Sequence, residues 1–294
     1  MHTLSHCPVC NSDKLKDAFS CVDHTTTQET FQVQTCNQCS FTLTNPRPND
    51  DQLGKYYESN DYISHSNNQK GIFNRIYQMV RYHAMESKFK LINGLNSNGL
   101  VLDYGCGTGE FLGYVQKQER TVIGVEPSEF ARKQAIKNHQ LNVLSLEEFP
   151  SISDNSASII SLWHVLEHVS NLRDTLSKFH SILNDQGHLV IAVPNCSSLD
   201  AEIYGPLWAG YDVPRHLWHF TPKTMQELLE SEGFKLLKMK GMPFDSYYVS
   251  LLSEKHRTGK MNPIRAFKNG LLSNWKARNN PGKTSSVIYI FQKK

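Results

Sequence analysis

Short apolar runs alternate with stretches of helical spacing from residue 99 onwards. The runs are LVLDY (100–104), TVIGVE (121–126), LNVLSL (141–146), SASIISLW (156–163) and HLVIAVPN (188–195), with helices predicted near 109–118, 128–138 and 171–184. Strands that alternate with helices of this length are joined by right-handed crossovers into a parallel sheet with helices on both faces. The alternation therefore predicts a doubly wound α/β domain.

A glycine-rich turn, YGCGTGEF (104–111), ends the first apolar run. Gly105, Gly107 and Gly109 have the spacing G-x-G-x-G, and Asp103 precedes them. Dinucleotide-binding folds use G-x-G-x-x-G and hold a pyrophosphate on backbone N–H groups. A carboxylate at Asp103 would repel a pyrophosphate, whereas it would attract the α-ammonium and sulfonium groups of S-adenosylmethionine.

A second acid, Glu126, ends the next predicted strand in VIGVEPS. Rossmann-type folds place an acid at this position to accept hydrogen bonds from the ribose hydroxyls. The two acids together favour a nucleoside with a cationic tail. The alternative is a tight turn between a strand and a helix that binds nothing.

At these residues the chain resembles the class I S-adenosylmethionine-dependent methyltransferases, in particular the small-molecule branch that includes ubiquinone-type O-methyltransferases. The resemblance covers about residues 99–240 and rests on VLDYGCGTGEFL, VIGVEPS, SLWHVLEHV and GHLVIAVPN in that order. It implies a seven-stranded Rossmann-like sheet and S-adenosylmethionine as the cofactor. The expected reaction is methyl transfer to an oxygen or carbon of a small-molecule acceptor.

The resemblance also implies which residues hold the cofactor. Asp103 and the turn at 105–109 contact the methionine part, Glu126 holds the ribose, and Trp163 lies along the cofactor. Within the turn, Cys106 is expected to be a small filler with backbone contacts rather than a reactive thiol.

The adenine contact stays open. Such families often place an acid before LEEF to bind the adenine amine, and Ser145 stands there in this chain. Leu146 is therefore expected to contribute packing and a backbone N–H.

Two histidine-rich stretches follow the fourth and fifth predicted strands. HVLEH (164–168) matches the metallopeptidase motif H-x-x-E-H, but it lies directly after a strand, where a helix would be needed. The resemblance places His168 at the mouth of the acceptor pocket, with structural packing as the alternative. In DVPRHLWHF (212–220), His216 is favoured as the group that takes up the acceptor proton.

Two neighbours of His216 share this loop. Arg215 would orient an anionic acceptor, and His219 is a further candidate base. For all three residues, a hydrogen bond that pins the loop is the alternative.

Four cysteines near the start of the chain have the spacing of a metal site. Cys7 and Cys10, with Cys36 and Cys39, form C-x2-C-x25-C-x2-C. Each pair can form a knuckle whose thiolates point at one metal, and two knuckles complete a tetrahedron. We expect structural zinc, with free thiols or a redox pair as the alternative.

The chain divides into three predicted parts: a zinc-ribbon-like module at 1–48, a helical connector at 49–98 and the methyltransferase domain at 99–294, with a basic helical insertion at 254–284. Tyr56, Tyr57 and Tyr62 in the connector are expected to pack in the core, with contact to the acceptor pocket as the alternative.

The inserted segment has an uneven charge. From Lys255 to Lys283 the sequence has eight Lys or Arg residues and no Asp or Glu, while the whole chain has a net charge of +3. Ile264, Phe267 and Trp275 fall at helical spacing within it. We expect this apolar stripe to pack on the domain or on a second subunit; docking on an anionic membrane is the less favoured alternative.

Composition narrows the remaining classes of protein. The chain has 294 residues, no apolar run near the ~18 residues of a membrane span, and a start without the layout of a signal peptide, so we expect it to be cytoplasmic. A zinc-ribbon protein that binds nucleic acid is the main alternative, but the cysteine module has few basic residues. A metallopeptidase would need a second, catalytic zinc.

Overall fold

The computed structural model describes residues 1–57, 72–95 and 98–294, and only the helical backbone of residues 72–81. Its larger sheet has seven strands in the order β10-β11-β8-β7-β4-β5-β6. The strands are β4 (Leu100–Tyr104), β5 (Val122–Val125), β6 (Val143–Leu144), β7 (Ala157–Trp163), β8 (Leu183–Pro194), β10 (Phe234–Gly241) and β11 (Ser286–Lys293). β4 to β8 pair in parallel, and β11 and β10 add two antiparallel pairings at one end.

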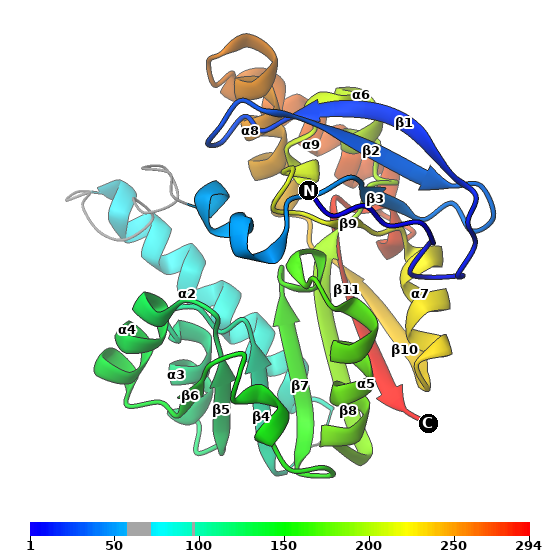
Figure 1. The fold of residues 1–294 in the computed structure, drawn as a ribbon. Helices are drawn as coiled ribbons and strands as arrows, with labels where there is room; N and C mark the ends of the chain where they lie inside the picture. Colours follow the sequence, from blue (N-terminus) through cyan, green and yellow to red (C-terminus); the bar gives the residue numbers. More distant parts are fainter. Residues whose placement is uncertain (58–71, 96–97) are drawn as a thin grey trace.

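Helices cover both faces of this sheet, as Figure 1 shows. They are α2 (Ile72–Asn93), α3 (Glu110–Gln116), α4 (Glu129–His139), α5 (Leu172–Ile182) and α7 (Pro222–Ser231), whereas α6 (Leu199–Tyr204) lies beyond the strands at the top of Figure 1. Side chains of a strand alternate between the faces, so Val101 packs with α2, α3 and α4, whereas Leu102 packs with α5 and α7. The predicted doubly wound α/β fold is confirmed.

A second, four-stranded sheet contains most of the cysteine module. Its order is β1 (Leu15–Val22), β2 (Thr30–Cys36), β3 (Thr42–Thr44) and β9 (Trp218–His219). The hairpin of β1 and β2 fills the long spacing between the two cysteine pairs. β9 comes from the histidine-rich loop, so the two ends of this sheet are far apart in the sequence.

The cysteine module shares a hydrophobic core with the larger sheet. Cys7, Phe41 and Leu43 belong to the same buried cluster as the side chains of α5. Arg173 of α5 also donates hydrogen bonds to the carbonyl oxygens of Pro8 (2.7 Å) and Val9 (2.8 Å) in the first cysteine turn. The module is therefore packed on the domain and not suspended from it.

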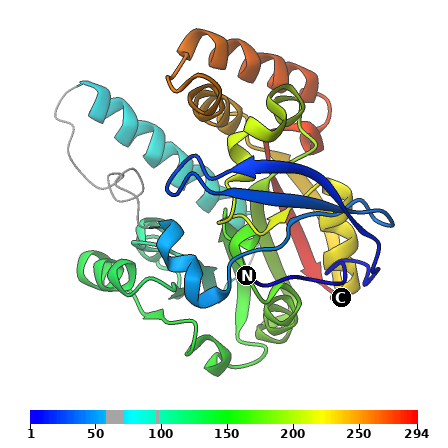
Figure 2. The same ribbon diagram turned by 45° about the horizontal axis from the view of Figure 1, so that its top comes forward.

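The segment between β10 and β11 forms a pair of helices, α8 (Asp245–Thr258) and α9 (Pro263–Ala277). Figure 2 shows α9 along the outer edge of the molecule, with α8 between it and the rest. The residues of α9 that are buried are small or polar: Ala266, Asn269, Gly270, Ser273 and Ala277.

The expected packing of the α9 apolar stripe on the domain is wrong. A Cβ on Gly270 would lie 2.7 Å from the Tyr247 ring and 3.1 Å from its backbone, so α8 and α9 approach too closely for large side chains between them. The small residues of α9 therefore face α8, and the apolar stripe stays exposed. In the described part of the chain, no helix is long and apolar enough to span a bilayer.

Arg215 links three segments at the junction of the two sheets. Its guanidinium donates to the carboxylates of Asp23 in the β1–β2 turn (3.0 Å) and of Asp212 (2.5 Å), and to the carbonyl oxygen of Tyr56 (2.8 Å). Tyr56 lies in the last turn of the 3-10 helix η1 (Asp50–Tyr57). Arg215 and Asp23 are both buried, so each charge depends on its partners.

Replacing Arg215 with Leu should lower the free energy of unfolding by about 3–5 kcal/mol, because Asp23 would keep a buried charge without a cation. Urea unfolding followed by circular dichroism measures this value. Lys223→Leu is the control, since its pair with Glu227 (3.7 Å) is exposed and should matter little. Equal stability of the two variants would contradict the importance of the Arg215 cluster.

Candidate functional site

The glycine turn lies where β4, β5 and β7 end. Gly105 has φ 77°, its N–H donates to the Val125 carbonyl at 2.7 Å, and a Cβ there would lie 2.5 Å from Val165. Gly107 also has a positive φ, 57°, but a Cβ on it would meet nothing within 4 Å. Gly105 is thus required by close packing, whereas Gly107 leaves open space at the strand ends.

Asp103 is buried beside this turn. It lies in register with Gly124 of β5 and Ser161 of β7, and Ser161 Oγ donates to its carboxylate at 2.5 Å. Burial raises the pKa of Asp103 to about 7; the Glu126 charge adds to the rise, while Ser161 and Lys88 oppose it. A carboxylate held at this pKa gains from any cation that binds next to it.

Among the described residues, Lys88 of α2 is the cation whose charge acts on Asp103. Its Nζ lies 4.5 Å from the centre of the Trp163 ring, and its charge acts on both Asp103 and Asp245. Burial lowers the pKa of Lys88, and the two carboxylates oppose that change. Lys88 was not predicted from the sequence, because nothing local marks a lysine in a long helix.

Glu126 lies at the end of β5, on the other side of the turn. The Gly107 N–H donates to its Oε2 at 2.9 Å and the Ser128 N–H to its Oε1 at 2.9 Å. Burial raises the pKa of Glu126, and these two N–H groups oppose the rise. Each carboxylate oxygen has a second lone pair, so Glu126 can accept two further hydrogen bonds from hydroxyl groups.

Trp163 ends β7 near the turn. Its ring meets Phe111 edge-on at 5.5 Å, and its buried Nε1–H has no hydrogen-bond partner within the described residues. Cys106 packs where Gly124 has no side chain, and burial raises the pKa of its thiol, as expected for a filler. Leu146 is exposed beyond β6, within a turn in which the Ser145 N–H donates to Glu148 at 2.8 Å.

His164 follows Trp163 directly and lies between two carboxylates. His164 has φ 58° and pairs with Asp245 (3.2 Å) and Glu167 (3.5 Å). Although burial opposes it, these two carboxylates raise the pKa of His164 to about 10. His164 is therefore an imidazolium that links the end of β7 to the start of α8.

His168 and His216 form the other half of the site. Their rings lie 4.6 Å apart in a T-shaped arrangement. His168 Nδ1 lies 2.9 Å from the Arg215 carbonyl, and His216 Nδ1 lies 2.8 Å from the Gly210 carbonyl. Because a carbonyl oxygen only accepts, both Nδ1 atoms carry hydrogen, and both Nε2 atoms keep a free lone pair in the neutral rings.

The environment of these histidines is unusual. Burial lowers the pKa of His168 to about 4, and the nearby His216 adds to this effect. Within the described residues, the buried Glu167 carboxylate has no hydrogen-bond partner beyond its 3.5 Å ion pair with His164. Ligand atoms of Glu167, His168 and His216 lie within 4.8 Å of one another, so the cluster could hold a metal ion or receive a proton.

Two of the residues expected to contact the methyl acceptor have other roles. Arg215 cannot orient an acceptor, because its guanidinium is buried and bound to Asp23, Asp212 and Tyr56. His219 is buried in β9, where its Nε2 lies 3.1 Å from Thr44 Oγ1 and burial lowers its pKa to about 3. Both residues pin the loop.

The tyrosines of the connector also differ from one another. Tyr56 packs against Phe31 in the core, as expected. The Tyr57 hydroxyl instead reaches His168 Nδ1 at 3.1 Å, so this residue belongs to the site. Tyr62 lies outside the described residues.

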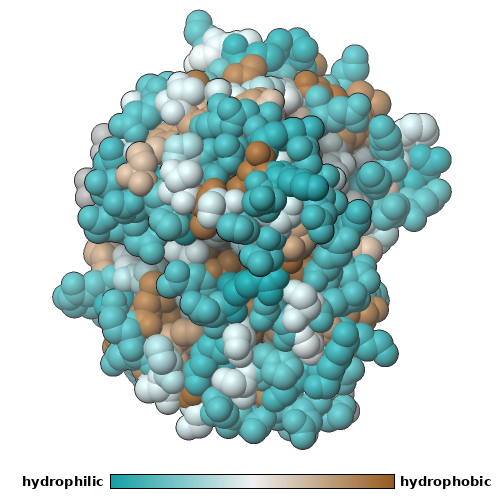
Figure 3. Space-filling view, turned by 45° about the vertical axis from the view of Figure 1, so that its right-hand side comes forward, coloured by the Kyte–Doolittle hydropathy of each residue, from teal (hydrophilic) through white to brown (hydrophobic). Residues whose placement is uncertain are grey.

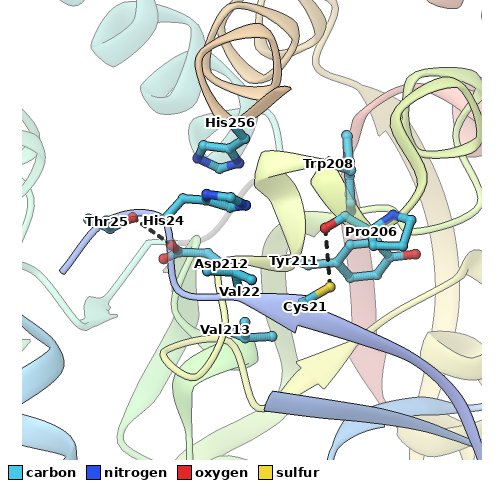
Figure 4. Close-up of a pocket in the computed structure, with 10 residues that line it drawn as sticks. All are labelled: Cys21, Val22, His24, Thr25, Pro206, Trp208, Tyr211, Asp212, Val213 and His256. Carbon is cyan, nitrogen blue, oxygen red and sulfur yellow. Dashed lines mark hydrogen bonds between the residues drawn. The ribbon is translucent and has the colours of Figure 1, made fainter. Parts of the chain in front are cut away.

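A pocket adjoins the histidine loop on the side of β1 and α8 (Figure 4). Its cavity volume is about 10 Å³, far below the ~300–1,000 Å³ of ordinary small-molecule sites. His24 and His256 stack at 4.3 Å beside it, and burial lowers the pKa of both rings. Asp212 lines the pocket but is bound to Arg215, so we assign no ligand there.

Comparison with known proteins points to the same family as the motifs at the ends of β4 and β5. Residues 60–239 match a family model described as a methyltransferase domain. The chain belongs to this methyltransferase domain family.

Individual relatives are more distant. The human mitochondrial ubiquinone biosynthesis O-methyltransferase is 27% identical over 168 residues, which cover 50% of this chain and 45% of that protein. A protein of Geobacillus sp. (strain WCH70) named as a methyltransferase is 28% identical over 143 residues, covering 45% of this chain and 58% of that protein. The chain thus spans about half the length of the curated relatives it matches.

The solved structures support the fold. A SAM-dependent methyltransferase from Archaeoglobus fulgidus has a TM-score of 0.51 and 21% identity, covering 76% of this chain and all (100%) of that one. The family and the Rossmann-like sheet expected from the sequence are therefore confirmed.

The metallopeptidase interpretation of HVLEH is wrong. Its motif needs both histidines on one face of a helix. In this chain, His164 lies outside any helix and points to Asp245, whereas His168 ends a three-residue 3-10 helix (Leu166–His168) and meets His216. The two histidines therefore do not share a metal.

The four cysteines of the first module come together as expected. Cys7 Sγ lies 3.5 Å from Cys39 Sγ, Cys10 Sγ lies 3.6 Å from Cys36 Sγ, and all four sulfur atoms are within 4.8 Å of one another. Tetrahedral zinc with Zn–S bonds of ~2.3 Å needs sulfur atoms about 3.8 Å apart. The cluster fits a closed structural zinc site that leaves no position for a substrate.

Purified protein should contain one zinc per chain, and Cys36→Ser should remove it, because three thiolates bind zinc more weakly than four. Metal analysis by mass spectrometry measures this content. Cys196→Ser is the matched control, since Cys196 lies outside the cluster and should leave the zinc in place. Zinc that survives Cys36→Ser would contradict the four-cysteine site.

Proposed function

We propose that the protein transfers the methyl group of S-adenosylmethionine to an oxygen or carbon of a small molecule. The observation that carries this proposal is the pair of buried acids, Asp103 and Glu126, at the glycine turn, where Gly107 leaves open space. A phosphate would be repelled there, and a cationic nucleoside would be attracted.

The residues of the turn match the parts of such a cofactor. Asp103 would bind the α-ammonium, and Lys88 would bind the α-carboxylate of the same methionine part. Glu126 would accept hydrogen bonds from the ribose hydroxyls. The free Nε1–H of Trp163 would find an acceptor on the cofactor, which supports the expectation that this ring lies along it.

The remaining cofactor contacts follow the sequence prediction. The backbone of Gly105, Cys106, Gly107 and Gly109 would approach the methionine part, and Leu146 would pack on the adenine. The exposed position of Leu146 at the end of the sheet agrees with such a contact. Ser145 adds no acid, and its N–H is bound to Glu148.

Methyl transfer from a sulfonium is an in-line displacement in which the carbon–sulfur bond breaks and its electron pair stays on sulfur. The protein has to align the acceptor atom with that bond and take up the proton that the acceptor loses. We propose that His216 Nε2 takes this proton. Asp212, 3.9 Å from that atom, would stabilise the imidazolium that forms.

His168 would position the acceptor next to His216. Its low pKa keeps it neutral, with Nδ1–H fixed on the Arg215 carbonyl and Nε2 free to accept a hydrogen bond. The Glu167 carboxylate, which within the described residues has no partner besides His164, would accept another. Three polar groups then converge on one small acceptor.

We do not expect nucleic acid as a partner, because the cysteine module is packed on the domain. A cytoplasmic location remains our prediction.

Asp103→Asn should weaken S-adenosylmethionine binding by about tenfold to a hundredfold, since a charge-assisted hydrogen bond contributes ~1.5–3 kcal/mol. Because the pKa of Asp103 is about 7, the ionised form that binds the cation is lost as pH falls below that value. Wild-type affinity should therefore drop between about pH 8 and about pH 6 by up to roughly tenfold, and the variant should lose most of this dependence.

Isothermal titration calorimetry at both pH values measures these affinities. Glu119→Gln removes an exposed acid outside the glycine turn and is the control that should change nothing. Equal affinity and equal pH dependence of wild type and Asp103→Asn would rule out the assigned cofactor site.

His216→Gln should slow methyl transfer by about 10²–10⁴-fold, the usual contribution of a general base, and should leave cofactor affinity unchanged. Formation of labelled product from methyl-labelled cofactor and cell extract measures the rate. His6→Gln, at an exposed histidine, is the control. Wild-type turnover by His216→Gln would exclude it as the base.

A further inference from the structure

Helix α9 presents an unusually exposed row of large apolar side chains. Ile264 is 85% exposed, Phe267 59% and Trp275 63%, with Leu271 between them at 50%. Their spacing places them on one side of the helix. Soluble domains seldom leave such a row in water unless it meets a partner.

The exposed face continues beyond α9. Tyr247 of α8 stacks on Phe267, with ring centres 5.3 Å apart. Met261 in the turn between the helices and Phe244 just before α8 are also exposed. In Figure 3, apolar side chains lie among polar ones at the top of the molecule, the level at which Figure 1 places α8 and α9.

The opposite face of α9 is fixed in place. Asn269 donates to the Tyr204 hydroxyl at 2.9 Å, and Ser273 Oγ donates to the buried Asp200 at 2.7 Å. Gly270 lies against Tyr247. These contacts hold the helix rigidly, so the apolar row cannot turn inwards without breaking them.

Cations surround the apolar row. Lys260, Lys268, Lys276 and Lys283 are all exposed, and residues 255–283 contain no acid. Arg257 and Arg265 share the buried Glu254, which comes just before this segment. Arg278 lies over the Trp275 ring at 4.3 Å. The face is therefore apolar at its centre and positively charged around it.

This charge decides between the partners that could cover the face. A two-fold dimer would bring the face against its own copy, so lysines would meet lysines with no acid in the segment to pair with them. Nucleic acid would match the lysines but would leave Ile264, Phe267 and Leu271 without a suitable contact. An anionic lipid surface matches both features, because headgroups attract the lysines and the acyl boundary accepts the apolar row.

We propose that the α8–α9 face docks the protein on an anionic membrane surface. Phe267 and Trp275 enter the interface, and the lysines bind anionic headgroups. Docking there also brings the site next to the lipid, because Asp245, the first residue of α8, is paired with His164 at the site. Phe244, next to Asp245, is 78% exposed on that side.

Sedimentation of the full chain with lipid vesicles tests this proposal. We expect wild type to bind vesicles of phosphatidylglycerol and phosphatidylcholine, to bind pure phosphatidylcholine much less, and to be released by salt. The double variant Phe267→Ser/Trp275→Ser should lose at least about tenfold in affinity for the anionic vesicles. Lys268→Glu/Lys276→Glu should abolish the preference for anionic lipid.

The matched control is Phe130→Ser, which removes an aromatic side chain that is 69% exposed on α4 and should leave vesicle binding unchanged. Circular dichroism and cofactor affinity show whether each variant is folded. Failure of wild type to bind anionic vesicles, or equal binding to both kinds, would overturn the proposal. A wild-type dimer that becomes a monomer in Phe267→Ser/Trp275→Ser, without vesicle binding, would assign the face to a second copy.

Discussion

The buried guanidinium of Arg215 joins the parts of the molecule that would otherwise be independent. It binds Asp23 of the cysteine module, Asp212 of the histidine loop and the end of η1. The two carboxylates raise the pKa of Arg215 against the effect of burial, so its charge is permanent. This cluster fixes the loop that carries His216. It also positions Tyr57 against His168 and the Arg215 carbonyl that binds the His168 ring.

This arrangement connects the cysteine module to the histidine loop and to α5. Its sheet is completed by β9, and its first cysteine turn is bound to Arg173 of α5. A zinc ion in the four-cysteine cluster would therefore stiffen the loop that carries His216, although it would lie outside the reaction. The cofactor half depends on a different constraint, the burial of Asp103 and Glu126 at the ends of neighbouring parallel strands.

Much of this could be predicted from the sequence, because the signals were local. The period of the strands, the glycine turn with its two acids and the spacing of the four cysteines each occupy a short stretch. Lys88, the partners of Arg215 and the contact from Tyr57 to His168 join segments far apart in the chain, so no local pattern marked them. For α9 the sequence indicated the apolar stripe correctly, but which face packs on α8 depended on Gly270 and its small neighbours.

The central claim is that the open space at Gly107 binds S-adenosylmethionine and that the histidine pair serves a small acceptor. The most direct measurement incubates the protein with methyl-labelled cofactor and whole-cell extract, then separates small molecules from macromolecules by ultrafiltration. We expect protein-dependent label in the small-molecule fraction, identified by mass spectrometry. Label confined to protein or nucleic acid would contradict it.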